Sequence, residues 1–246
     1  MLAAGLSWGA VYLVFAAAGV PLTVGFALRY PATLPTGGPD ADPEVPTARA
    51  SIFGAALRHP AVLASGLFLA VYVGVEISLG NWLYSLLVED RGQGALLAGG
   101  VVSAYWMGFT LGRFVLSVLA ERFGIGPADL AWGCLTVVMA AATTVWLVPG
   151  ILTAGTGLVV LGFALGPIYP LTVAVLPRMA PRRLVPTAIG ILVGVSVLGG
   201  AFFPWVAGTL ADAAGLGSLL PYILLLGAAL LANWWWISRR LAAAPP

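Results

Sequence analysis

Long apolar runs, separated by short polar segments, follow one another along almost the whole chain. Glycine and proline inside these runs are compatible with helix, because membrane helices tolerate both. Seven runs are long enough to cross about 30 Å of bilayer hydrocarbon, and they cover residues 2–28, 61–88, 94–119, 130–148, 150–176, 187–211 and 217–238. The pattern therefore predicts an all-α integral membrane protein with seven transmembrane helices.

The one long polar segment lies between the first two runs. It is rich in proline, glycine and acidic residues from Pro31 to Pro46, a composition typical of a flexible linker. We expect four parts: a helix over 1–28, a cytoplasmic linker over 29–60, a six-helix bundle over 61–238 and a cytoplasmic tail over 239–246.

Arginine positions predict the orientation of the chain in the membrane. The chain has 11 arginines and no lysine. Ten of the arginines belong to one set of connections, which consists of the 29–60 linker, the 120–129 loop with Arg113 just before it, the 177–186 loop and the tail. The other set, which holds the N-terminus and the remaining loops, carries only Arg91. Positive residues favour the cytoplasmic side. We therefore expect the N-terminus outside and the C-terminus inside.

Composition excludes several other classes of protein. Apolar residues make up 61% of the chain and charged residues 8%, against about 45–50% and about 25% in soluble domains. With no lysine there is no Schiff base for retinal, and the single cysteine, Cys134, allows neither an intrachain disulfide nor a cysteine metal cluster. His59 is the only histidine. We expect no enzyme activity, no cofactor, no metal site and no nucleic-acid partner.

Glu76 is the most informative residue, because it lies at the centre of the second run. A charge at that depth costs about 2.5–3.5 kcal/mol, so the carboxyl must be protonated, paired or hydrated. It is a candidate for binding a proton or a solute, unless it is a neutral group hydrogen-bonded to a neighbouring helix. Tyr72 shares its helical face. Gly74 and Gly80 predict a weakened helix here, with Asn81 as the polar amide nearest to the expected break.

A second candidate group lies at a cytoplasmic corner. Arg113, Glu121 and Arg122 form an arginine–glutamate–arginine pattern that would suit an ion-pair gate. The alternative is that Arg113 is an interfacial arginine whose side chain reaches the membrane surface.

Aromatic residues and prolines add three further solute-binding candidates. Trp106 lies in the middle of the third run, away from the span ends where the other tryptophans gather, and Tyr105 is beside it. Residues 167–170 (PIYP) interrupt the fifth run, either as a simple kink or as a kink that presents Tyr169 to a solute. Glycine pairs spaced four apart predict close helix contacts; they are Gly108 with Gly112, Gly162 with Gly166 and Gly190 with Gly194.

Several of these segments are similar to one transporter family. Residues 72–82 (YVGVEISLGNW) resemble the seventh helix of the fucose–proton symporter group of the major facilitator superfamily, and residues 105–113 resemble its eighth helix. Residues 113–124 resemble the superfamily's loop between helices eight and nine. Residues 162–170 resemble helix ten, and residues 199–212 helix eleven.

The resemblance implies an architecture of twelve helices in two halves joined by a cytoplasmic linker. This chain would then be helix six, the linker and the carboxyl-terminal half. An amino-terminal half, with much of the proton site, would be a partner in addition to the lipid bilayer. Its absence would reflect a truncated or split gene product or a misassigned start.

The resemblance also implies a function, with alternatives. We expect a multi-pass plasma-membrane protein, in bacteria an inner-membrane one, that takes up a sugar or similar small polar solute with protons. Glu76, Trp106 and Asn81 favour this over export of drugs or metabolites. A non-transporting membrane fragment or subunit is the alternative from a different class.

Overall fold

The computed structural model describes residues 13, 16–17, 19–21, 23–25, 29, 45–148 and 150–243. The chain divides into two compact units, Met1–Ala48 and Arg49–Pro246. Over the described residues all regular structure is helical: α2 (Val45–Arg58), α3 (Pro60–Ser85), η2 (Leu86–Asp90), α4 (Ala95–Phe123), α5 (Pro127–Leu147), α6 (Ile151–Leu165), α7 (Ile168–Val175), η3 (Leu176–Arg178), η4 (Arg182–Leu184), α8 (Val185–Ala214), η5 (Leu216–Ser218) and α9 (Leu219–Ala242).

Six described segments are long and apolar enough to cross a membrane. They are Pro60–Asp90, Ala95–Phe123, Pro127–Leu147, Ile151–Arg178, Arg182–Ala214 and Leu216–Ala242. These segments confirm the second to seventh predicted spans, including the boundary expected at Pro149 and Gly150. Most of the first predicted span, 2–28, lies outside the described residues, so the seventh helix and the orientation of the termini stay predictions.

The second part of the predicted linker differs from our expectation of a flexible segment. Residues Val45–Arg58 form helix α2. Pro46 stands in its first turn, where the missing amide hydrogen costs nothing, and no other proline or glycine except Gly54 interrupts the alanine-rich sequence that follows. Residues 30–44 of the linker lie outside the described part of the chain.

Glycine and proline mark the turn between helices α4 and α5. Helix α4 ends at Phe123 and is followed by Gly124, whose φ of 67° suits glycine; the Ile125 amide closes the turn by donating to the Ala120 carbonyl at 2.9 Å. Helix α5 then begins with Pro127 at its first position. The chain thus reverses within a few residues, as short membrane loops require.

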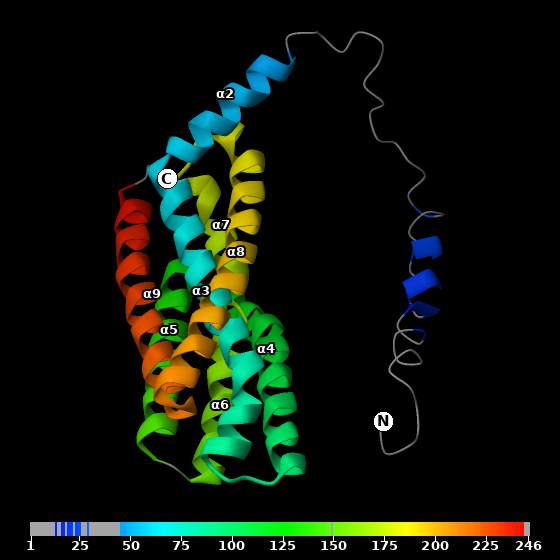
Figure 1. Cartoon of the computed structure of the whole chain (residues 1–246). Coiled ribbons are helices and arrows are strands. Elements are labelled where there is room, and N and C mark those ends of the chain that lie inside the picture. The colour runs from blue at the N-terminus through cyan, green and yellow to red at the C-terminus, as the bar shows by residue number, and fades with distance from the viewer. Residues whose placement is uncertain are drawn as a thin grey trace. The chain divides into compact units, whose positions relative to one another are not determined.

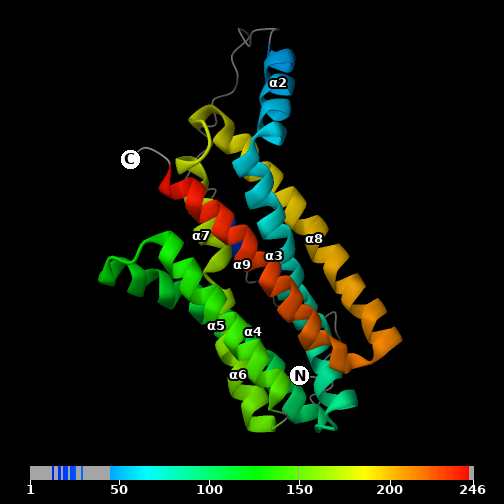
Figure 2. The same cartoon turned by 90° about the vertical axis from the view of Figure 1, so that its left-hand side faces the viewer.

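The bundle consists of two tightly packed helix pairs and two connecting helices. Helix α3 packs most extensively on α8, and α4 on α6. Helix α5 contacts α6 and α9, while α9 also contacts α3. Figures 1 and 2 show α3 running alongside α8, and α4 alongside α6. Contacts between α3 and α4 are few by comparison, which leaves a seam between the two pairs.

Glycine allows the close approach within each pair. A Cβ on Gly112 would collide with the Phe163 main chain, and one on Gly166 would collide with the Phe109 carbonyl, so α4 and α6 cross backbone to backbone. Two of the predicted glycine pairs are therefore confirmed as close contacts. A Cβ on Gly190 or Gly194 meets nothing within 4 Å among the described residues, so the third pair makes no such contact within this bundle.

Helix α3 runs unbroken from Pro60 to Ser85, so the predicted break beside Glu76 is wrong. Gly74 and Gly80 instead make room for ring side chains, because a Cβ on either would collide with Phe203 or Trp106 respectively. The break lies in the predicted 150–176 span, where α6 ends at Leu165 and α7 begins at Ile168.

Trp234 and Trp82 lie toward span ends, where an interfacial aromatic belt is expected, but both pack within the bundle. Trp234 is fully buried, stacks near Phe68 and donates from Nε1 to the Ala128 carbonyl at 3.3 Å. Trp82 donates to the carbonyl of Pro204 at 3.0 Å and so ties α3 to the proline site of α8. A buried carbonyl within reach of the indole N–H outweighs the interface preference at both positions.

Candidate functional site

Tyr72 connects α3 to the break in the 151–178 segment. Its side chain is fully buried, and its hydroxyl donates to the Leu165 carbonyl at 2.9 Å. Leu165 is the last residue of α6. Tyr169, on α7, faces the same ring, with 6.2 Å between the two ring centroids. Two candidate residues from distant parts of the sequence therefore meet at the helix break.

Tyr105 connects α4 to Glu76. It is fully buried, and its hydroxyl donates to the main-chain carbonyl of Glu76 at 3.3 Å. The Trp106 ring packs edge-on against Tyr105, with centroids 5.2 Å apart, and lies over Gly80. These contacts fix the position of Glu76 relative to α4.

Arg113 reaches the break from α4. Its Nε donates to the Gly166 carbonyl at 3.2 Å, and its guanidinium lies 4.8 Å from the centroid of the Phe109 ring. Pro170 has no amide hydrogen to offer the carbonyl four residues before it, which is that of Gly166. The arginine thus replaces the helix hydrogen bond that the proline removes.

The Glu76 carboxyl lies close to both of these groups. It is half-buried and lies within interaction range of the Tyr72 hydroxyl and the Arg113 guanidinium. Tyr72 in turn interacts with the Arg113 guanidinium. A hydroxyl has one proton, so Tyr72 can donate either to Glu76 or to Leu165 at a given time.

We call Tyr72, Glu76, Tyr105, Trp106, Arg113 and Tyr169 the seam cluster, because they meet where α3 faces α4 and α7. Sparse contact between α3 and α4 leaves these polar groups at the boundary of two packed helix pairs. A carboxyl, a guanidinium and three phenols at such a boundary can exchange hydrogen bonds without disturbing either pair.

Three candidate residues lie elsewhere. Asn81 is exposed, and on an ideal helix it points about 140° away from Glu76. Glu121 and Arg122 are exposed in the last turn of α4. Within the described part of the chain, Arg113 is bonded to the break and forms no ion pair with Glu121. The expected three-residue cluster is therefore not assembled in this conformation.

The sequence interpretation missed the acceptors at the break, the main-chain carbonyls of Leu165 and Gly166. Pro170 carried a usable signal for Gly166, because a proline leaves the carbonyl four residues earlier without its helix donor, but the same rule gives no signal for Leu165. Phe109, beneath the Arg113 guanidinium, gave no comparable signal in the sequence.

Comparison with known proteins adds two findings. No family model matches the chain. The chain is 30% identical over 218 residues to a glucose/galactose transporter of Brucella abortus, an alignment that covers 86% of this chain and 50% of that protein. It is also 30% identical over 171 residues to the "Bypass of stop codon protein 6" of Saccharomyces cerevisiae, covering 65% of this chain and 34% of that protein.

The chain spans about half the length of the transporter it matches, and less of the yeast protein. Together with six membrane-crossing helices, the similarity describes a multi-pass membrane protein of a sugar-transporter-like kind.

Proposed function

We propose that this chain is the carboxyl-terminal half of a proton-coupled sugar transporter of the major facilitator superfamily, similar to the fucose–proton symporter group. In that arrangement residues 1–28 are helix six, residues 29–60 the cytoplasmic linker and residues 61–238 helices seven to twelve. The protein belongs to the plasma membrane and takes up a sugar or similar small polar solute. The similarity to a glucose/galactose transporter supports the solute class.

The observation that carries this proposal is the position of Glu76 in the seam cluster. It is a half-buried carboxyl inside a membrane-crossing helix, and it interacts with the phenol of Tyr72 and the charge of Arg113. Because an unpaired charge at mid-bilayer costs about 2.5–3.5 kcal/mol, the groups around it decide when it holds a proton.

Tyr72 provides a route from the proton on Glu76 to the helix break. When Glu76 is ionised, the Tyr72 hydroxyl donates to the carboxylate, and the Leu165 carbonyl loses that donor. When Glu76 is protonated, its own hydroxyl donates to the Tyr72 oxygen, and Tyr72 donates to Leu165, the bond seen here at 2.9 Å. Proton loading thereby strengthens the contact between α3 and the end of α6.

Arg113 provides the opposing contact. An ionised Glu76 attracts the guanidinium, which would draw it from the Gly166 carbonyl that it now holds at 3.2 Å. Protonation removes this attraction and leaves Arg113 on the break. Both contacts therefore change in the same direction, and the break is held by two donors when the proton is bound.

Replacement of Glu76 by glutamine tests this proposal. The assay is sugar transport in vesicles that contain the chain together with the amino-terminal half that the proposal requires. Glutamine keeps the shape and hydrogen bonding of the side chain but cannot titrate. We expect Glu76→Gln to abolish accumulation driven by a proton gradient, while exchange of labelled for unlabelled sugar stays close to the unmodified rate.

The matched control is Glu89→Gln, which removes one carboxylate from an exposed position in η2, outside every candidate group. It should leave accumulation and exchange unchanged. If Glu76→Gln lowers exchange as much as accumulation, Glu76 binds the solute rather than the coupling proton. If neither activity changes, Glu76 is structural and the proposed mechanism fails.

A further inference from the structure

A basic pocket outside the seam cluster lies where three membrane-crossing segments end. It has a volume of about 310 Å³, and its lining includes His59, Ala61, Arg178, Trp236 and Arg240. The pocket is at the lower end of the range for small-molecule sites, about 300–1,000 Å³. None of its lining residues is acidic, so the two guanidinium charges face no carboxylate within the pocket.

The three elements that build the pocket place cations around it. His59 immediately precedes Pro60, the first residue of α3, and provides no side-chain cap for that helix. Arg178 ends η3, and Arg240 lies in the last turn of α9 with its guanidinium 4.9 Å from the Trp236 ring centroid. Stacking on the indole holds one arginine in place while its N–H groups remain free to bind a ligand.

His59 adds a ring nitrogen that the fold does not use. Its Nδ1 is buried and has no hydrogen-bond partner among the described residues. Buried polar groups normally have a partner, so this nitrogen is left for a ligand beside the two arginines.

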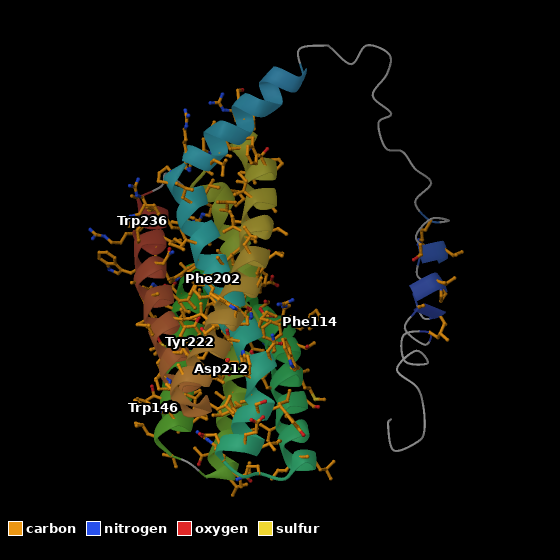
Figure 3. The ribbon with its side chains drawn as sticks, viewed as in Figure 1. Phe114, Trp146, Phe202, Asp212, Tyr222 and Trp236 are labelled. Atoms are coloured by element: carbon orange, nitrogen blue, oxygen red, sulfur yellow. The ribbon has the colours of Figure 1, made fainter. Side chains whose placement is uncertain are left out.

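The depth of the pocket in the membrane identifies the kind of ligand. Spans Pro60–Asp90, Ile151–Arg178 and Leu216–Ala242 each have one end here, so the pocket lies at the level of lipid headgroups. Figure 3 shows Trp236 near the end of α9, at the same end of the bundle as the start of α3. Basic pockets between membrane helices suit anionic headgroups, and an indole at this level suits the interface.

We propose that this pocket binds the phosphate of an anionic phospholipid headgroup, held by Arg178, Arg240 and His59. The apolar part of the lining, which includes Ala61 and Met179, contacts the glycerol end of the lipid. The proposal does not depend on what the seam cluster transports.

The test compares the purified full chain in nanodiscs of phosphatidylcholine with nanodiscs that also contain phosphatidylglycerol. Thermal unfolding and native mass spectrometry report protection and bound lipid. We expect phosphatidylglycerol to protect the unmodified chain, and Arg178→Gln with Arg240→Gln to weaken its binding about tenfold or more. Both arginines are exposed, so their replacement leaves no cavity in the core.

The matched control removes two charges from elsewhere with Arg122→Gln and Arg183→Gln, which are exposed and do not line the pocket. It should keep the protection. Equal loss in both double variants would show nonspecific charge attraction and overturn the proposal. Inorganic phosphate is the third arm: if it protects through Arg178 and Arg240 while phosphatidylglycerol does not, the ligand is a soluble anion and the lipid assignment is wrong.

Discussion

Replacement of Tyr72 by phenylalanine tests whether the Tyr72 hydroxyl couples proton binding to transport, apart from its contribution to stability. The substitution removes the hydroxyl that donates to Leu165 at 2.9 Å and that also interacts with Glu76. Tyr222→Phe is the matched control, because Tyr222 is also buried and donates to a helix carbonyl, that of Phe203, at 3.0 Å. Figure 3 shows Tyr222 on α9. Both variants lose one phenol donor to a main-chain carbonyl.

The stability cost of the two variants should be similar. Side-chain hydrogen bonds between membrane helices contribute about 0.6 kcal/mol on average and up to about 1.7 kcal/mol, so each variant should unfold only slightly more readily. Proton-coupled sugar accumulation, in contrast, should differ between the two variants. In the assembled transporter, Tyr72→Phe breaks the route from Glu76 to the helix break, and the sugar accumulation ratio should fall about tenfold, a coupling loss of about 1.4 kcal/mol.

Accumulation driven by a proton gradient and sugar exchange at equilibrium are measured in the same vesicles. We expect Tyr72→Phe to retain exchange and lose accumulation, and Tyr222→Phe to retain both. If the two variants lose accumulation equally, general loosening of the bundle explains the effect and the relay through Tyr72 is refuted. The same holds if Tyr72→Phe accumulates sugar normally.

Two further predictions concern the fold and its orientation. Gly112→Leu should destabilise the chain by about 1–3 kcal/mol through overpacking, because a Cβ there already collides with the α6 backbone. Gly190→Leu should be tolerated, since no described residue lies within 4 Å of a Cβ at that position. Thermal unfolding in detergent compares the two variants, and equal losses of stability would contradict the close crossing of α4 and α6. A cysteine replacing Gly215 should react with an impermeant thiol reagent from outside and one replacing Pro181 should not; the reverse pattern would overturn the predicted orientation.

The sequence by itself determined which six segments of the described bundle are long and apolar enough to cross a membrane. Inside hydrocarbon every backbone donor and acceptor must be satisfied within its own helix, so a long apolar run is sufficient to predict a span. The same local logic identified Glu76 as a costly residue at mid-depth and predicted the interruption at residues 167–170. Each of these conclusions depends on residues close together in the chain.

Only the tertiary structure decided how these helices use their unusual residues. Gly74 and Gly80 allow ring side chains to approach an unbroken α3, and Arg113 binds the break at Gly166 rather than Glu121. Trp234, expected at the lipid interface, lies fully buried. Lipid tails are as apolar as a protein core, so the sequence pattern does not reveal which face of a membrane helix meets its neighbour. Helix rotation, and with it every side-chain partner, is set by packing between segments distant in the sequence.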